Sequence, residues 1–395
     1  MKIVGIVAEY NPFHNGHKYQ IDYIKEHYKP DGIVAIISGS FSQRGEPTIV
    51  DKFARADMAI RSGVDLVLEL PFIYSCQNAE IFASGAIKIL NDFGPISHIS
   101  FGAEDENMEN LINIAKSIIS PNVYYDEILK KHINDGLSYI ISNERALLES
   151  ETLNLAQVNT MKKPNNILAI EYIKTILKND YSMDILPVKR HLATHSTVHV
   201  INDFTSSTKL RNMIYKSEPI ERLVPKSTDK NLIDASLPNM ATLKALIDYN
   251  LVEDIKNTNS ILDNEHGLIN RCKNLFINSN DYQSGIELVS SKRITKSRVR
   301  RFLTNYIVYD NDTDFIRNSL KFSNSYIRIL GMNQIGRQII RLSNNENIIT
   351  KFKDYEKLDD NIGKIADIEV KANNIRSLLC NEVINSDYLK SPIIL

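Results

Sequence analysis

The sequence predicts an α/β protein in which a doubly wound, Rossmann-like parallel sheet is followed by a mostly α-helical domain. Three observations lead to this prediction. In residues 1–220, short apolar runs alternate with amphipathic runs, an order typical of a parallel sheet with crossover helices. The run Gly32–Ser38 is continuously apolar, as in a strand buried on both faces. In residues 221–395 glycines thin out and helical periodicities dominate, and Pro219 and Pro225 mark the boundary.

The elements of the first domain can be assigned in chain order. The predicted strands are Ile3–Ala8, Gly32–Ser38, Asp65–Leu70, His98–Gly102 and Ile185–Lys189. The predicted helices are Asn15–His27, Asp51–Ser62, Asn78–Leu90, one that begins near Asn107, and Ile167–Leu177. In the second domain we expect helices over Ala241–Asp248, Thr295–Tyr306 and Asp314–Ile329. Because doubly wound sheets bind ligands beyond the carboxyl ends of their strands, the loops that follow the strands are the candidate site.

The composition excludes several classes of protein. The 395 residues are 43% hydrophobic with a formal net charge of −1, so the whole molecule is not a generic polyanion binder. Cys76, Cys272 and Cys380 lie far apart and form no metal or redox motif, which suits a reducing cytoplasm. The N-terminus shows no signal peptide, and no apolar run reaches membrane-spanning length. We therefore expect a cytoplasmic protein that has no membrane partner, and nothing in the sequence implies a protein partner.

The most informative segment is Asn11–His17, which joins the first predicted strand to the first predicted helix. Helix N-termini bind phosphates through backbone N–H groups and the helix dipole. His14 and His17 add two donors beside Gly16, which permits close approach of the backbone. Two histidines three apart are also common on ordinary helix surfaces. A zinc site is not indicated, because the pattern lacks the H-E-x-x-H spacing and has no cysteine pair nearby.

A second candidate element is Thr205–Arg211, where hydroxyl residues precede a helix that begins with two cations. Ser207 and Thr208 could simply cap this helix, as serine and threonine commonly do. Hydroxyls, N–H groups, Lys209 and Arg211 together also suit a phosphate. Alongside the two histidines, this element favours a phosphate site.

Three further segments carry weaker signals. The loop Ser38–Pro47 contains Gln43 and Arg44 between two glycines, and it is either a surface turn or a binding loop. Asp51 or Lys52 is assigned a role, although an exposed salt-bridged helix face explains most charges of that segment. Asn165 and Asn166 precede a helix and serve either as caps or as contacts to adenine or ribose, and Lys189 and Arg190 end a strand.

The second domain contains a local excess of positive charge. Ser291–Arg341 holds eleven Lys or Arg and three Asp. The dense part consists of Lys292, Arg293, Lys296, Arg298, Arg300 and Arg301. Such a run is commonly a solvated face, but in a nearly neutral protein it suggests an anionic partner. Tyr306, Tyr309 and Tyr326 could stack on bases or belong to the core.

The two phosphate-site elements together resemble the paired motifs of the nucleotidylyltransferase superfamily. A closer resemblance is to the tRNA(Met) cytidine acetate ligase family, and it extends over most of the chain. The segments that carry it are Gly5–His17, Gln43–Pro47, Asp65–Pro71, Pro164–Leu168, Ser297–Arg301 and Leu330–Asn333. The resemblance implies an enzyme that activates acetate with ATP as acetyl-adenylate. It further implies acetylation of the exocyclic amine of the wobble cytidine of elongator tRNA(Met), and it leaves open whether Mg²⁺ accompanies ATP.

The resemblance also implies roles for particular residues. His14, His17, Lys209 and Arg211 would stabilise charge on the α-phosphate. The implied ATP contacts are Val7, Ala8, Glu9, Tyr10, Asn11, Pro12, Phe13, His14, Asn15, Gly16, His17, Lys18, Tyr19, Gln20, Gly102, Asn165, Arg190, Ser207 and Thr208, with Asn166 as the alternative to Asn165. The basic run of the second domain, Lys292 to Arg301, would hold the anticodon arm by its phosphates. No metal ligands are implied.

One segment departs from the family pattern, because Thr194–His199 stands where a Tyr-His-Asp-like run is expected. The roles of His195 and His199 are therefore open, and Glu9, His191 and His195 are all candidates for the base that deprotonates the cytidine amine. Two rival hypotheses are a nucleotidylyltransferase for a small phosphorylated metabolite and a non-catalytic RNA-binding protein with a nucleotide pocket. The basic second domain argues against the first, and the intact histidine motif argues against the second.

Overall fold

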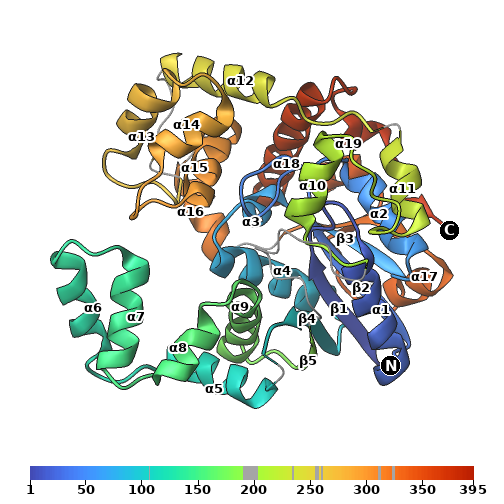
Figure 1. The fold of residues 1–395 in the computed structure, drawn as a ribbon. Helices are drawn as coiled ribbons and strands as arrows, with labels where there is room; N and C mark the ends of the chain where they lie inside the picture. Colours follow the sequence, from blue (N-terminus) through green and yellow to red (C-terminus); the bar gives the residue numbers. More distant parts are fainter. Residues whose placement is uncertain are drawn as a thin grey trace.

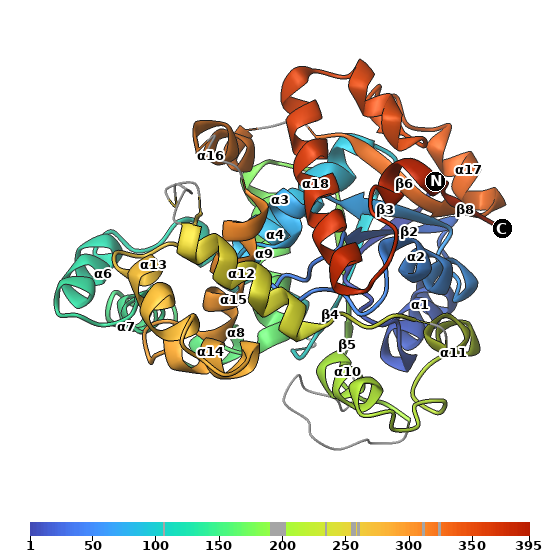
Figure 2. The same ribbon diagram turned by 90° about the horizontal axis from the view of Figure 1, so that it is seen from above.

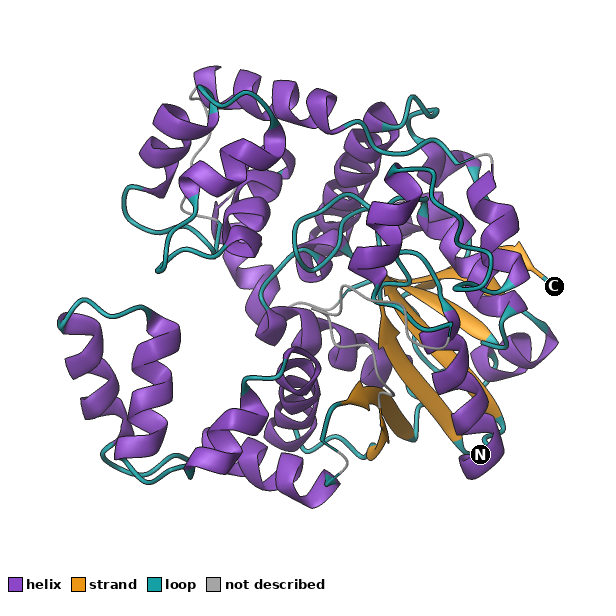
Figure 3. Ribbon diagram, viewed as in Figure 1, coloured by secondary structure: helices purple, strands orange, loops and turns teal. Residues whose placement is uncertain are grey.

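The protein is built around one eight-stranded sheet (Figures 1 and 3). The computed structural model describes residues 1–105, 107–189, 203–233, 235–253, 258, 261–309, 313–322 and 325–395. The strands are β1 (Ile3–Ala8), β2 (Gly32–Ser38), β3 (Leu66–Leu70), β4 (His98–Ala103), β5 (Asp184–Lys189), β6 (Ile327–Met332), β7 (Ile348–Ile349) and β8 (Ile393–Ile394). Their order is β5-β4-β1-β2-β3-β6-β7, and β8 pairs with β6. The five strands predicted for the first domain are confirmed, within one residue at either end.

Strands β1 to β5 are parallel, and the chain order along the sheet reverses at β1. From β1 the chain adds β2 and β3 on one side and then β4 and β5 on the other. In register, Ile3 lies beside Gly32, and Ala8 lies beside Ile37. The boundary between β1 and β4 is therefore a topological switch point, the position where such sheets bind ligands beyond the carboxyl ends of their strands.

Helices cover both faces of the sheet. The side of Ile3 and Ile36 packs against α4 (Ala79–Phe93) and α9 (Pro164–Lys178). The side of Val4 and Ile37 packs against α1 (Asn15–Tyr28) and α2 (Lys52–Arg61). This alternation of neighbouring residues between two cores follows from the two-residue period of a strand and makes the sheet doubly wound.

Three strands beyond residue 220 belong to the same sheet as β1 to β5. The boundary predicted at residue 220 therefore does not separate the sheet from the rest of the chain. Strand β6 lies antiparallel beside β3, and β7 and β8 pair with it. The predicted helix Asp314–Ile329 is wrong in its second half, because α16 (Thr313–Phe322) ends before β6 begins. Every residue of β6 is buried, and a short apolar run of this kind fits a buried strand as well as a helix.

Two helical projections extend from the same side of the sheet (Figures 1 and 2). One contains α5 (Met108–Ile119), α6 (Tyr125–Asn134), α7 (Tyr139–Glu149) and α8 (Leu155–Met161). The other contains α12 (Met240–Glu253), α13 (Leu268–Arg271), α14 (Tyr282–Val289), α15 (Lys296–Val308) and α16. The helices predicted over Ala241–Asp248 and Thr295–Tyr306 are confirmed within α12 and α15. The remaining helices are α3 (Phe72–Ser75), α10 (Ser207–Tyr215), α11 (Lys226–Ile233), α17 (Gln334–Ile340), α18 (Asp360–Leu379) and α19 (Ser386–Leu389).

A buried ionic cluster joins the sheet to the C-terminal helices. Lys52 Nζ lies 2.9 Å from Glu369 Oε1 and 2.7 Å from Asp387 Oδ1, and it also contacts Glu69. Arg328 of β6 contacts Glu69 and Asp387. None of these five side chains is more than 1% exposed. Because an unpaired buried charge is costly, the cluster fixes how α18, α19 and β6 pack on α2 and β3.

Asp51 and Lys52, one of which was expected to have a functional role, both have structural roles in the fold. Asp51 is the N-cap of α2, where its Oδ1 accepts hydrogen bonds from the N–H groups of Phe53 and Ala54 at 2.7 and 2.9 Å. Its other carboxylate oxygen pairs with Lys390 at 2.7 Å. Across the described ranges, none of the helices is both long and apolar enough to span a membrane. The three cysteines are buried and unpaired with one another.

Candidate active site

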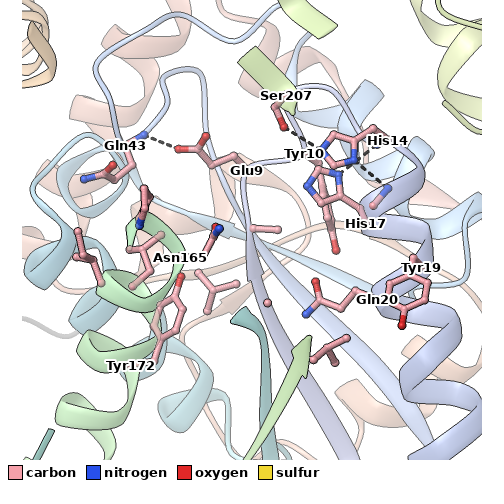
Figure 4. Close-up of a pocket in the computed structure, with 18 of the residues that line it drawn as sticks. Glu9, Tyr10, His14, His17, Tyr19, Gln20, Gln43, Asn165, Tyr172 and Ser207 are labelled. Carbon is pink, nitrogen blue, oxygen red and sulfur yellow. Dashed lines mark hydrogen bonds between the residues drawn. The ribbon is translucent and has the colours of Figure 1, made fainter. Parts of the chain in front are cut away.

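A cavity of about 350 Å³ opens at the switch point between β1 and β4 (Figure 4). Its walls come from the ends of β1, β4 and β5, the N-termini of α1, α9 and α10, and the loop after β2. Twelve of the residues predicted to contact ATP line it: Val7, Ala8, Glu9, Tyr10, His14, Gly16, His17, Tyr19, Gln20, Gly102, Asn165 and Ser207. The segments singled out in the sequence thus meet at one place, although β1 and α10 are far apart in the chain.

The two histidines are held by the backbone at the start of α1. His14 is the N-cap of the helix, and its Nδ1 accepts a hydrogen bond from Gly16 N at 3.1 Å. His17 Nδ1 accepts one from His14 N at 3.2 Å, which completes a reciprocal capping box. The rings stack with centroids 3.8 Å apart. Because both Nδ1 atoms act as acceptors, each neutral ring carries its proton on Nε2.

Ser207 connects this histidine pair to α10. His14 Nε2 lies 3.1 Å from Ser207 Oγ, and the His14 side chain is only 2% exposed. The preceding residue, Ser206, caps α10 by accepting a hydrogen bond from Lys209 N at 3.2 Å. The N-termini of α1 and α10 therefore converge, and both direct positive dipole ends toward the same region.

Two of the four residues predicted to act on the α-phosphate do not lie on the cavity wall. Lys209 and Arg211 are absent from the described residues that line it, and so is Thr208. Arg211 Nη1 donates to the carbonyl oxygen of Asn11 at 3.1 Å, and its Nη2 pairs with Glu46 at 2.9 Å. Ser207 and Arg211 are four residues apart, so Arg211 lies about one turn further along α10, where these contacts hold it against the loops that carry Asn11 and Glu46.

Several motif residues support the loop that carries the histidines instead of facing the cavity. Asn11 Oδ1 accepts a hydrogen bond from Ile49 N at 2.9 Å, and Phe13 is fully buried in the core. Asn15 Nδ2 donates to the carbonyl oxygens of Asp203 and Arg222 at 3.0 and 2.7 Å. Pro12 and Lys18 also lie off the wall, and Lys18 pairs with Asp22.

The far side of the cavity, opposite the histidines in Figure 4, is formed by Asn165 and Tyr172 of α9. Asn165 Nδ2 donates to Glu104 Oε1 at 2.7 Å. Asn166 is fully buried, and its Oδ1 accepts a hydrogen bond from Glu104 N at 2.9 Å. Of the two asparagines, only Asn165 lines the cavity, while Asn166 holds the segment after β4.

Apolar side chains complete this side, and no pattern in the sequence distinguishes them from core residues. They are Ala79, Phe82, Ile167, Leu168 and Tyr172. Tyr172 is 3% exposed, and its burial raises the pKa of its hydroxyl well above the ordinary value. Their helical spacing is that of ordinary core residues, so only the fold distinguishes a cavity wall from a core contact. A flat aromatic ring such as adenine suits this surface.

The loop after β2 contributes Gln43 and Arg44, so its interpretation as a binding loop fits its position. Gln43 N donates to Glu9 Oε1 at 2.7 Å, and Gln43 Nε2 donates to the carbonyl oxygen of Gln77 at 2.9 Å. Glu9 is the single carboxylate among the described residues of the cavity wall. Arg190, His191, His195 and His199 lie outside the described residues.

Comparison with known proteins agrees with this geometry. A family model described as HIGH Nucleotidyl Transferase matches residues 1–390. The chain is 34% identical over 412 residues to a protein named tRNA(Met) cytidine acetate ligase from Clostridium kluyveri, covering 100% of this chain and 99% of the relative. It is 34% identical over 373 residues to the protein of that name from Thermoanaerobacter sp. (strain X514), covering 91% of each.

The chain belongs to the tRNA(Met) cytidine acetate ligase family. The resemblance inferred from the sequence is thereby confirmed. Solved structures agree, since Thermotoga maritima TmcAL without ligand superposes with a TM-score of 0.92 at 30% identity over 100% of both chains. The same protein bound with alpha-thio ATP superposes with a TM-score of 0.89.

In this member of the ligase family, most charges of the basic run are paired within the protein. Arg301 is buried and makes a bidentate pair with Asp263 at 2.6 and 2.9 Å. Three other arginines and one lysine pair with carboxylates at 2.7 to 3.1 Å: Arg293 and Arg298 with Glu265, Arg300 with Glu46, and Lys296 with Glu287. The sequence could not show this, because these carboxylates come from other segments. The exposed cations are Lys292, Arg293 and Lys296.

The described residues contain side chains of the types that bind metal ions, namely His, Cys, Asp and Glu. Among them, no group of three His, Cys, Asp or Glu side chains lies close enough together to hold a metal ion. The polar groups on the cavity wall include the histidine pair and Glu9.

Proposed function

We propose that this protein activates acetate with ATP and acetylates the exocyclic amine of the wobble cytidine of elongator tRNA(Met). The observation that carries the proposal is the stacked pair of His14 and His17 at the N-terminus of α1, inside a cavity at the switch point of the sheet. Backbone bonds to both Nδ1 atoms orient the rings before any ligand binds. Such preorganised donors stabilise charge that develops in a transition state.

ATP is the nucleotide that fits this cavity. Adenine would lie against Tyr172 and the apolar residues of α9, and the phosphates would extend toward the starts of α1 and α10. An ATP analogue bound to the Thermotoga maritima relative supports this choice. The volume of about 350 Å³ lies within the usual range for small-ligand sites.

In the first step, a carboxylate oxygen of acetate attacks the α-phosphorus. The new P–O bond gives acetyl-adenylate, and the bond to the bridging oxygen breaks with release of pyrophosphate. Negative charge grows on the α-phosphate oxygens as acetate approaches. His17 Nε2–H and the positive end of the α1 dipole would stabilise it, while His14 orients α10 through Ser207.

In the second step, the amine of the cytidine attacks the acetyl carbonyl carbon. An N–C bond forms, the C–O bond to the phosphate breaks, and AMP leaves. Glu9 accepts the proton that the amine loses, since its carboxylate lies on the cavity wall. The exposed Lys292, Arg293 and Lys296 would contact phosphates of the anticodon arm.

Two assays test this function. The protein is incubated with ATP, radiolabelled acetate and either elongator tRNA(Met) or a variant in which uridine replaces the wobble cytidine. We expect label in the first RNA and none in the second, because uridine has no exocyclic amine. Acetate-dependent exchange of pyrophosphate into ATP, without tRNA, reports the first step alone. Exchange without label in tRNA would contradict the proposed acceptor, and absence of both would contradict the whole proposal.

A further inference from the structure

A second cavity, of about 690 Å³, lies behind the wall of the first. It is bounded by α10, α12, α14, α15 and the segment 46–49. The two cavities share α10, where Ser207 faces the first and Thr208 the second. They also share the loop after β2, where Gln43 and Arg44 face the first and Glu46 faces the second. The two cavities therefore lie on opposite sides of one wall.

Glu46 holds two arginines at this shared wall. Its Oε2 lies 2.9 Å from Arg211 Nη2, and its Oε1 lies 3.1 Å from Arg300 Nη1. Arg300 Nη2 also donates to Gln283 Oε1 at 3.1 Å. Both guanidinium groups are therefore fixed in position before a ligand arrives, which lowers the entropy lost on binding.

Three residues that line this cavity each have a buried polar atom with no hydrogen-bond partner among the described residues. They are Tyr282 Oη, Arg300 Nε and Asp248 Oδ1. Tyr282 is 4% exposed. Buried polar atoms in native proteins almost always have partners, so an acceptor, a donor and a hydroxyl in one cavity indicate a polar ligand.

The charged residues of the cavity wall indicate the net charge of the ligand that would fit it. Among the described residues, Arg211, Lys244 and Arg300 are balanced by Glu46, Asp248 and Asp281. A free anion would gain little from such a wall. A neutral ring with donors and acceptors on its edge fits better, because apolar side chains such as Met240 and Ile277 also line the cavity.

We propose that this cavity binds the base of a nucleotide that flanks the acetylated cytidine in the single-stranded loop of the tRNA. The inference rests on the proposed function, since it requires a tRNA cytidine in the first cavity. Proteins read single-stranded RNA by splaying bases apart and bonding their edges. The wall formed by the loop after β2 and by α10 separates two adjacent bases, and Tyr282, Asp248 and Arg300 read the flanking one.

The test uses elongator tRNA(Met) transcripts that keep the wobble cytidine and carry each other base at one flanking position at a time. We expect kcat/KM of the natural protein to fall about tenfold or more at one flanking position, since a buried polar group left unpaired costs about this factor. In Tyr282→Phe and in Asp248→Asn the discrimination should shrink to about threefold or less. Tyr249→Phe, an exposed neighbour on α12, is the matched control and should keep full discrimination.

The ratio of kcat/KM values between two tRNAs cancels any general loss of activity. Tyr282→Phe removes a hydroxyl that has no partner in the described part of the chain, so its unfolding temperature should not fall. Equal kcat/KM on all flanking bases, or undiminished discrimination in both variants, would overturn the inference while leaving the proposed function intact. Absence of label from every tRNA would overturn the proposed function and this inference with it.

Discussion

Two groups of buried polar side chains, one around Lys52 and one around His14, differ in what surrounds them. The Lys52 cluster consists of full charges that contact one another and are sealed from solvent. The His14 group consists of two imidazole rings bonded to the backbone and to Ser207, and it borders a cavity. Residues of both groups fall within segments that resemble the ligase family. The comparison shows that such a segment can be sealed in the core in one place and border a cavity in another.

The largest expected effect is on stability, in the sealed cluster. Lys52→Met leaves Glu69, Glu369 and Asp387 with fewer cations in a buried site, so the free energy of unfolding should fall by about 3–5 kcal/mol. Urea denaturation followed by circular dichroism measures it. Lys178→Met, at an exposed lysine of α9, is the control and should change stability by less than about 0.5 kcal/mol. A loss of under 1 kcal/mol at Lys52 would mean that the cluster tolerates its missing cation.

The next effect is on chemistry, in the open group. His17→Ala should slow acetate-dependent pyrophosphate exchange by about 10²–10³-fold, the usual cost of one donor to a developing anion. His27→Ala, on the same helix but exposed, should leave the exchange rate unchanged. If His17→Ala instead lowers the free energy of unfolding as much as Lys52→Met does, the histidine pair has a structural role like that of the Lys52 cluster.

The pH dependence of stability tests the Lys52 cluster while all of its side chains are kept. Burial, with the neighbouring Glu69 and Asp387 and against the attraction of Lys52, raises the pKa of Glu369 to about 7. The folded state then binds this proton more tightly than the unfolded state, whose pKa is near the ordinary 4.5. The contribution to the free energy of unfolding is complete below pH 4.5 and is lost as the pH rises through 7, by at most about 3 kcal/mol.

Glu369→Gln isolates this contribution, since it keeps the shape of the side chain but cannot titrate. Denaturation curves between pH 5 and 8 should show a smaller loss of stability with rising pH in the variant than in the natural protein. Parallel curves for the two proteins would assign the pH dependence to other groups.

The smallest effect is expected at cations that are neither buried nor beside a cavity. Lys292→Ala and Lys296→Ala should each weaken tRNA binding by about three- to tenfold and make its salt dependence shallower by about one ion. Filter binding at several salt concentrations measures both quantities. Lys357→Ala, an exposed lysine outside α15, is the control. Unchanged affinity in both α15 variants would move the phosphate contacts to another surface.

Local patterns in the sequence are sufficient to predict the strands β1 to β5, the helix α1 and the position of the cavity. In these segments the period of apolar residues and the strand-to-helix junction at Asn11–His17 determine the structure locally. The sequence does not predict strand β6, and the predicted helix Asp314–Ile329 overlaps its first three residues, because its neighbour in the sheet, β3, is distant in the chain. Asn165 and Asn166 could not be separated either, since only the packing of α9 decides which one is buried.

Contacts between distant residues also changed the interpretation of charged groups. Arg211 pairs with Glu46, and Arg301 pairs with Asp263, so neither guanidinium is an isolated cation. The family resemblance placed both in functional motifs, but it carries no information about which face of a helix a residue occupies in the fold. Tyr172 was missed for the opposite reason, because a buried tyrosine at helical spacing has the pattern of a core residue.

The Lys52 cluster also constrains the order in which the chain can reach its final state during synthesis. Lys52 and Glu69 leave the ribosome early, whereas Arg328, Glu369 and Asp387 follow only near the end of translation. Until then the nascent sheet carries a lysine whose buried position lacks two of its three carboxylates. A sheet of β1 to β5 that forms during synthesis therefore has an exposed β3 edge until β6 is made and pairs with it. In this protein the segments that line the first cavity are encoded first, but the sheet that holds them is completed last.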